Sequence, residues 1–592
     1  MNDFVNYLNS IHNIGGDSTG SLAEKQVTSP YFDMIKVDRK IGDHIANCVA
    51  TGEHKAFIIT GHAGDGKTSI LFQVLKALNR LSENTELNTI YEFSDFYCVK
   101  DMSEISEKDQ IEILRKTLDS PLDNKTSLLI SNTGPLLRAF LQLIEKRRIE
   151  NSTQLSDCEM LEIQSKLLLQ LDQNNDEPLS IDDYTFTLIN IARVDNVPFS
   201  VRILRKIIDE KLWTKCVACI NKDVCPIKNN QEIVMMQIDR VSAFIESYYR
   251  FLYENDKRMT IRQLVGHISF ALTGNLSCET IASKPLKDPI FNYNFANLFF
   301  GYWGLTEKKE CLQIKGIERI RSLNIEGIAL DVDYDLFVKH DYSCFLPTIQ
   351  NLITNLQKKY RKLYKIYDEE TMLLKSSNKI DNELRNSIRR FYLMYSQYSG
   401  ESNIYTVINQ VFGLNFSDYQ KLVTEKQNKA MLRNFKELVF RALYIKNTGF
   451  LPDNENNLPL TLRREDSVFQ NVMLVLGKVN MNDIEIIQEP QLSSYEDFHG
   501  KQQVFIRFND KSFPLSLPMV TYFNELISGA IASNINPSLT HGIATLDAML
   551  IEQYGDDLPE SKDDCELTVL INTIHGQELK RFAFDGDSLS IL

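Results

Sequence analysis

The sequence of 592 residues lacks an apolar run near the roughly 18 residues that a membrane-spanning helix needs. Its start, MNDFVNYLNS, lacks the basic stretch and apolar core of a secretory signal. Its ten cysteines are too few and too scattered for a disulfide framework. We therefore expect a soluble, cytoplasmic protein with no membrane partner.

Positive charge is also in short supply, because 65 lysines and arginines face 79 acidic residues, for a net charge of -14. This balance argues against a protein that binds nucleic acid over its whole surface, but it allows a local basic patch. Hydrophobic residues make up 43% of the chain and charged residues 24%, which is ordinary for globular proteins. The length predicts about three or four domains.

The pattern of apolar and polar residues changes along the chain and divides it into several expected parts. Between residues 31 and 205, short apolar runs alternate with helical patterns, which is typical of a parallel α/β sheet. Strands are expected at 56–60, 96–100, 127–131 and 184–192, and one helix near 518–531 is expected among C-terminal strands. The expected parts are an N-terminal arm (1–30), an α/β core (31–205), a cysteine-containing insert (206–235), a helical lid (236–300), a helical domain (301–445) and a β-rich C-terminal domain (446–592).

The segment GHAGDGKT, residues 61 to 68, matches the phosphate-binding P-loop pattern at Gly61, Gly66, Lys67 and Thr68. A glycine-rich turn after a strand can aim several backbone N–H groups at a phosphate, and the following helix adds its positive end. The lysine reaches the β- and γ-phosphates and the threonine hydroxyl binds Mg²⁺. The other residues expected to contact the nucleotide are Ala63, Gly64, Asp65 and Ser69.

Two acidic residues follow the second expected strand, FYCVK. Hydrolysis of the nucleotide needs a carboxylate at such a strand end beside Mg²⁺. We expect Asp101 to bind Mg²⁺ and Glu104 to assist catalysis; Asp95 and Glu92 are the alternatives. The alternative interpretation is that Asp101 caps the helix that follows.

Two further residues are candidates for catalysis. Asn132 follows the strand LLIS and can orient the attacking water, as the sensor residue of AAA+ ATPases does, or it is a turn residue. The segment KRMTIRQLVGHISFALTG resembles AAA+ lid helices, where Arg262, or alternatively Arg258, would reach the γ-phosphate. The alternative for both arginines is a surface position.

A cysteine motif, KCVACINKDVCP, supplies Cys216, Cys219 and Cys225 within ten residues. In a cytosolic protein this spacing predicts a metal site, and Cys278 is the candidate fourth ligand. Zinc is favoured over an iron–sulfur cluster, and three free thiols in a loop remain the alternative.

The stretch QKKYRKLYK places basic residues and tyrosines between Lys358 and Lys365, and Arg385, Arg389 and Arg390 follow. Such a patch can meet DNA phosphates, although a solvated helix face paired with carboxylates is the favoured interpretation.

Taken in order, GHAGDGKT, VKDMSE, LLISNTG, the cysteine motif, TIRQLVGHISFALTGNLSC and a tail containing LPLTLRRED and PLSLPMVTYF resemble the DptF (DndF) family. These are P-loop ATPases of bacterial DNA phosphorothioation-dependent restriction systems, and the resemblance covers most of the chain. It implies an AAA+-like P-loop core with a helical lid, a helical middle domain and a β-rich C-terminal domain. It also implies roles for Lys67 and Thr68 and, by position, for Asp101, Asn132 and Arg262.

The expected function is ATP binding and hydrolysis, with Mg²⁺, in a defence complex that acts on DNA lacking phosphorothioate. Expected partners are other proteins of that complex, DNA through the basic patch or through those proteins, and further copies of the chain. No nuclease motif is visible. The alternative is an ATP-dependent switch or scaffold without sustained hydrolysis or DNA contact.

Overall fold

The computed structural model shows a mixed α/β chain in two units, Met1–Val411 and Phe412–Gln491 with Gly500–Leu592. No helix in the described part of the chain is both long and apolar enough to cross a bilayer. The structure describes residues 1–12, 26, 28–81, 87–150, 155–173, 177–359, 379–397, 401–426, 428–452, 455–462, 471–490, 502–530, 536–555, 565–573, 576–584 and 588–592.

A six-stranded sheet in the order β2-β3-β4-β1-β6-β5 organises the first unit. Its four central strands are parallel, and its two edge strands pair antiparallel with their neighbours. The four strands expected from the sequence form this parallel centre, so the α/β prediction is confirmed. The strands are β1 (Ala56–Thr60), β2 (Ile90–Glu92), β3 (Phe96–Val99), β4 (Thr126–Ile130), β5 (Leu179–Ile181) and β6 (Tyr184–Asn190).

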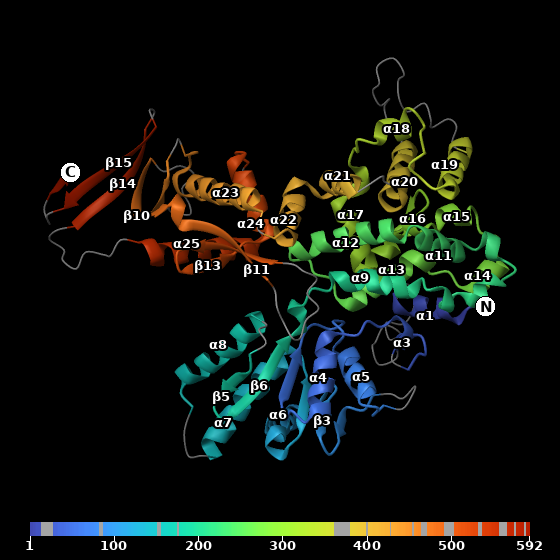
Figure 1. Ribbon diagram of the computed structural model, residues 1–592, viewed down its shortest axis with the longest axis horizontal. Helices are drawn as coiled ribbons and strands as arrows, with labels where there is room; N and C mark the ends of the chain where they lie inside the picture. The colour runs from blue at the N-terminus through green and yellow to red at the C-terminus, as the bar shows by residue number, and fades with distance from the viewer. Residues whose placement is uncertain are drawn as a thin grey trace. The chain divides into compact units, whose positions relative to one another are not determined.

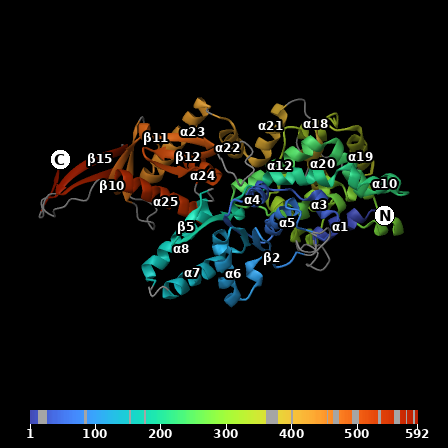
Figure 2. The same cartoon turned by 60° about the horizontal axis from the view of Figure 1, so that its bottom comes forward.

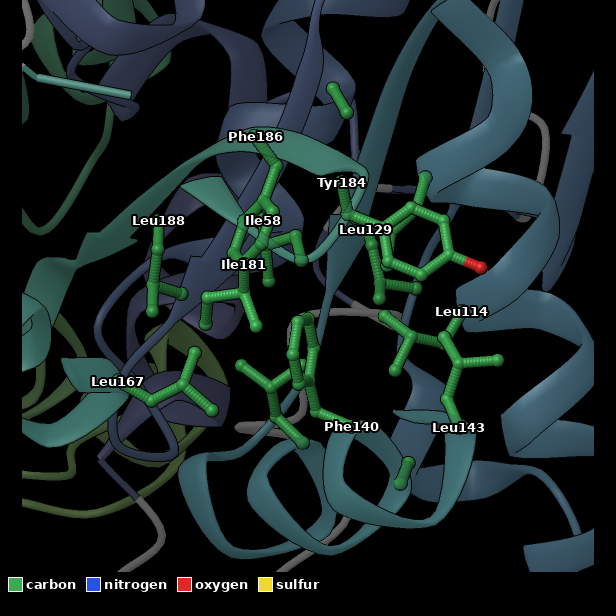
Figure 3. Packing of buried hydrophobic residues seen from close by; sticks show 14 of the residues in the cluster. Ile58, Leu114, Leu129, Phe140, Leu143, Leu167, Ile181, Tyr184, Phe186 and Leu188 are labelled. Atoms are coloured by element: carbon green, nitrogen blue, oxygen red, sulfur yellow. The ribbon is translucent and has the colours of Figure 1, made fainter. Parts of the chain in front are cut away.

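Helices cover both faces of this sheet (Figure 1). On one face, α4 (Lys40–Thr51) and α5 (Lys67–Ala77) pack on alternate residues of the central strands, among them Phe57 and Ile59. On the other face lie α6 (Glu107–Asp119), α7 (Thr133–Glu150) and α8 (Asp157–Gln173), with α7 beside α6 and α8 (Figure 2). Ile58 and Leu129 point into that second core (Figure 3). Near-continuous apolar strands are what a sheet buried on both faces requires.

The rest of the first unit is mainly helical. Helix α13 is its central member and lies against α1, α9, α16 and α17. Its start is fixed by a capping box, in which Thr260 and Gln263 each bond the other's backbone N–H. The helices are α1 (Asp3–Ile11), α3 (Phe32–Ile35), α9 (Val197–Ile207), α10 (Thr214–Val217), α11 (Pro226–Met236), α12 (Ile238–Glu254), α13 (Ile261–Thr273), α14 (Cys278–Ser283), α15 (Pro289–Asn292), α16 (Phe295–Phe299), α17 (Lys315–Leu323), α18 (Asp333–Phe337), α19 (Pro347–Lys359), α20 (Lys379–Tyr395) and α21 (Glu401–Phe412), with a short hairpin of β7 (Tyr302–Trp303) and β8 (Thr306–Glu307).

The second unit combines two antiparallel sheets with helices. One sheet has the order β16-β15-β14-β10-β9 and the other β11-β12-β13. The helix expected near 518–531 is present as α24 (Leu517–Ile527), but the expectation of a single helix there is wrong, because α25 (Pro537–Tyr554) follows it. The other elements are α22 (Leu414–Thr424), α23 (Lys429–Thr448), β9 (Asn457–Leu462), β10 (Val472–Asn480), β11 (Ile484–Pro490), β12 (Gln502–Phe508), β13 (Lys511–Pro514), β14 (Cys565–Thr573), β15 (Gly576–Phe584) and β16 (Leu589–Ile591).

Candidate functional site

The glycine-rich loop leaves the carboxyl end of β1, at the centre of the parallel sheet. The carboxyl ends of β4 and β3 lie at the same edge, because these strands are parallel to β1. The chain crosses from one side of β1 to the other between β4 and β6. Open α/β sheets bind ligands at such a switch point, so the fold brings the end of each strand to one potential site.

The loop has the backbone that its glycines allow. Gly64 and Gly66 have φ values of 93° and 89°, which side chains with a Cβ rarely adopt. Helix α5 then begins at Lys67, with Gly66 at its N-cap, and no side chain caps its first turn. The N–H groups of that turn, which contains Thr68 and Ser69, therefore face a ligand position with the positive end of the helix dipole.

Lys67 is largely buried and its ammonium group lies within the loop. Nζ donates to the carbonyl oxygens of Gly61 (2.6 Å) and His62 (3.4 Å) and to Oδ1 of Asn132 (2.8 Å). Burial lowers the pKa of Lys67, which nearby Asp101 and Asp65 oppose. The sequence candidates Lys67 and Asn132 are thus in direct contact.

The ends of β3 and β4 are joined through Ser103. Asp101 Oδ1 accepts a hydrogen bond from the Ser103 backbone N–H (2.8 Å), and Ser103 Oγ accepts one from the Asn132 N–H (3.2 Å). Asp101 thus caps the short 3-10 helix Met102–Glu104, as the alternative interpretation expected, while still lying close enough to influence Lys67.

The remaining acidic candidates point to other partners. Glu104 pairs with Lys100 (3.2 Å). Asp95 pairs with Arg80 (2.6 Å) and Glu92 with Lys116 (2.7 Å). Glu92 is paired in the sheet with Tyr97 and Asp95 directly precedes β3, so both lie at the amino end of β3, opposite the loop. Of the carboxylates considered for the position beside the glycine loop, this placement favours Asp101.

Asp65, at the middle of the loop, forms a buried ion pair with Arg258. Its side chain is fully buried; Oδ1 accepts from Arg258 Nη1 (2.8 Å), and Oδ2 accepts from the His62 N–H (3.0 Å). Arg258 also donates to the carbonyl oxygens of Val194 and Ile191, both at 2.9 Å. Arg258 is therefore committed to the loop's anchoring carboxylate rather than to a phosphate position.

Arg262 lies beside the loop at the start of α13. Its backbone N–H donates to the Gly64 carbonyl (3.1 Å), and a Cβ built on Gly64 would lie 3.0 Å from the Arg262 Cβ. Burial lowers the pKa of Arg262, and its charge in turn lowers that of Lys67. The structure thus brings Arg262 to the same charged cluster as Lys67 and Asp101.

An apolar cavity of about 80 Å³ adjoins the loop. Gly64, Gly66 and Ser69 form its loop side. Its other walls come from elements before β1 and from the helical part, including Ile35, Val37, Ile203, Ile261 and Val265. A flat apolar group attached to a phosphate would find contact surface here.

The four candidate cysteines also come together. They line one cavity of about 330 Å³, into which Asn2 also reaches. Burial raises the pKa of the Cys216 and Cys225 thiols. Within the described ranges, however, no three His, Cys, Asp or Glu side chains are grouped so that they could hold a metal ion as they stand.

The basic stretch gives a different result. Tyr360 to Lys365 lie outside the described residues, and Lys359 pairs with Asp288. Arg385, Arg389 and Arg390 are buried, so both the favoured interpretation of a solvated helix face and the alternative of phosphate contact are wrong for these three residues. Arg389 is held by Asp333 (Nε to Oδ1, 3.0 Å), and Arg390 lies over the Tyr302 ring at 4.0 Å. These arginines hold the helices together.

Comparison with known proteins finds no family model and no curated protein that matches this chain.

Two residues of this site, Ser103 and Arg39, were not identified from the sequence. Ser103 lies in VKDMSE next to Asp101, but only the contact between β3 and β4 shows that it bridges to Asn132. Arg39 donates to the Asp65 carbonyl (3.2 Å) from a segment with no motif of its own. Both act through contacts between residues distant in the chain, which a single sequence does not display.

Proposed function

We propose that the first unit binds ATP with Mg²⁺ at residues 61–69 and hydrolyses it, with a P-loop core and a lid of AAA+ type. The observation that carries this proposal is the position of Lys67, whose ammonium group lies inside a glycine turn at the carboxyl edge of a parallel sheet, 2.8 Å from Asn132 Oδ1. Backbone amides, a helix start and a lysine converge there.

Each side chain then has a task. Lys67 would exchange its contacts with Gly61 and Asn132 for phosphate oxygens, which leaves the Asn132 amide to orient a water molecule. Arg262, beside Gly64, would stabilise charge on the terminal phosphate. The apolar cavity would take the base, since Ile35, Val37 and Ile261 offer it flat contact.

A magnesium ion would be held by the Thr68 hydroxyl and by Asp101, directly or through water. It would neutralise charge on the phosphate oxygens. Asp101 presents an oxygen-only ligand of the kind Mg²⁺ prefers, although one of its oxygens already accepts the Ser103 N–H.

The biological setting that we propose is a DNA-restriction complex acting on DNA that lacks phosphorothioate. The resemblance of the ordered motifs to the DptF family supports it, and it implies other defence proteins as partners. DNA would be met through those partners or through residues 358–365, and copies of the chain would assemble around the ATP site.

The direct test is steady-state ATP turnover with and without DNA, for the wild type and Asp101→Ala. We expect turnover that DNA stimulates, and a loss of about 100-fold or more in the variant while ATP still binds. Asp95→Ala is the matched control, since that carboxylate lies at the opposite sheet edge. No turnover by the wild type under any DNA condition would refute the enzyme.

A second candidate, an ATP-dependent switch or scaffold, is favoured by one contact. Asp101 already caps residues 102–104, so this carboxylate has a structural task that does not need Mg²⁺. In that case ATP would bind at Lys67 and remain intact. Tight binding without turnover, equal in wild type and Asp101→Ala, would select this function.

A further inference from the structure

The four candidate cysteines belong to two segments of the first unit that the helical fold brings together. Cys216 lies in α10, Cys219 in the turn after it, and Cys225 at the N-cap of α11. Cys278 begins α14, after α13 has carried the chain back to the same place. All four line one cavity, whose wall also contains the apolar side chains of Ile220 and Ile281.

The thiols are near neighbours without being bonded to one another. Cys216 is within electrostatic range of Cys219 and Cys278, and Cys225 of Cys216 and Cys278. None of them forms a disulfide. Because the described side chains do not converge on one point, ligation requires the thiols to change rotamer. Each sulfur turns about a single Cα–Cβ bond, with three staggered positions open to it.

Hydrogen-bond donors lie close to two of the cysteines, Cys216 and Cys225. Asn2 Nδ2 donates to Cys216 Sγ at 3.4 Å. Cys225 is the N-cap residue of α11, whose first-turn backbone N–H groups are not capped by a side chain. Donors of this kind stabilise thiolates, and metal-bound cysteines characteristically have them as outer partners.

We propose that Cys216, Cys219, Cys225 and Cys278 bind a thiolate-ligated metal centre, either zinc or an iron–sulfur cluster. Four cysteine thiolates satisfy tetrahedral zinc, and they equally satisfy a cluster. The described residues of the cavity wall include no histidine or carboxylate to activate a metal-bound water, so the role that we propose for the centre is structural. Binding releases the four thiol protons to solvent, and no oxidant is needed for zinc.

The centre would fasten the N-terminal helix to the helical part. Asn2 also donates to the Leu212 carbonyl (2.9 Å), and Asn9 to that of Leu276 (2.7 Å), so α1 lies between the two cysteine segments. Lys215 pairs with Asp3 at 2.7 Å. A metal joining these segments would fix α1 against α13, whose first turn contacts the glycine loop.

The test begins with the full-length chain purified without oxygen and without added metal, followed by measurement of zinc, iron and acid-labile sulfide. About one zinc per chain, or iron with equal sulfide and visible absorption, supports the centre and identifies it. Less than about a tenth of an equivalent of either metal overturns it.

The test variant combines Cys219→Ser with Cys278→Ser in one chain. Its matched control is Cys158→Ser. Cys219 and Cys158 are both exposed, so replacing either removes no buried packing. The double variant should lose most of the metal, and Cys158→Ser should retain it. As an independent readout, a mercurial reagent should release metal from wild type in step with thiol modification. Metal retained by the double variant, or lost equally from Cys158→Ser, contradicts the assignment.

Discussion

The glycine loop and the cysteine cavity are each marked by a sequence motif, but the loop is formed by backbone and the cavity by side chains. The loop is made of backbone, and its shape is already fixed by glycine dihedrals, by the start of α5 and by the Asp65–Arg258 pair. The cysteine cavity is made of side chains, which share one cavity without meeting at a point. A backbone site is pre-organised by folding, whereas a thiolate site is completed by what it binds.

Helix α13 connects the two regions. Arg262 in its first turn contacts the loop, and Cys278 follows four residues after its C-cap, Gly274. Between them lies His267, fully buried against Tyr249 and Phe299. Substitutions in the glycine loop, in α13 and at the end of β3 therefore test how far the glycine loop depends on each of these contacts.

The largest effect is expected from Lys67→Ala. Loss of two charge-assisted hydrogen bonds to phosphate should weaken ATP binding roughly 1,000-fold, or about 4 kcal/mol. Calorimetry or nucleotide competition would measure it. Lys76→Ala removes an exposed lysine from the same helix and should bind ATP normally. A Lys67→Ala chain with unchanged affinity would show that the loop is not the nucleotide site.

A pH effect comes from His267 in the middle of α13. Nε2 faces the Phe299 carbonyl (2.8 Å), so it carries the proton, and Nδ1 accepts from the Tyr249 hydroxyl (2.8 Å). Burial lowers the pKa of His267 from 6.5 to about 4. The unfolded chain therefore binds a proton first as pH falls, and stability present above pH 6.5 is lost toward pH 4, by up to roughly 3 kcal/mol.

Chemical denaturation at pH 7, 6 and 5 would measure this loss. His267→Gln should flatten part of the slope between pH 6.5 and 4. Since burial also lowers the pKa of His12 to about 4, His12→Gln is the matched comparison. If the unfolding free energy changed equally with pH in the wild type and in both variants, the buried neutral histidines would not be the cause of the pH dependence.

Asp65→Asn tests the anchoring of the loop. Removing the charge from a fully buried acceptor of Arg258 should cost about 2 kcal/mol of unfolding free energy. The double variant with Arg258→Met should lose less than the sum of the single changes. Asp33→Asn, in an exposed pair with Lys76, should cost under about 1 kcal/mol. Additive losses would show that the two residues act separately.

The smallest effect is expected from Glu104→Gln. This carboxylate is exposed and paired with Lys100, so ATP turnover should stay within about twofold of wild type. A loss comparable with that of Asp101→Ala would reassign the catalytic carboxylate to Glu104.

The sequence predicted best what depends on neighbours in the chain. The strand before Gly61, the helix from Lys67 and the strand ends at Asp101 and Asn132 follow from local pattern, and parallel order then brings them to one edge. The pairing of Asp65 with Arg258 joins residues 193 positions apart, so no local pattern could show it.

Burial was the second limit. Arg390 resembles a surface residue in sequence, yet it is fully buried, with its Nε donating to Asn297 Oδ1 (3.0 Å) and its guanidinium over the Tyr302 ring. Helix α25 was missed although Asn536 caps it and Pro537 starts it, since only Ile543, Leu546 and Leu550 mark its buried face. Sparse burial leaves a weak periodicity.

The two edge strands of the six-stranded sheet, β2 and β5, limit how the sheet can be extended. Strands β2 and β5 each contain three residues and reverse direction relative to the parallel centre. A short antiparallel border offers an incoming strand very few unpaired N–H and C=O groups, which protects a sheet from edge-to-edge aggregation. Extension of this six-stranded sheet by a strand from another molecule is therefore disfavoured.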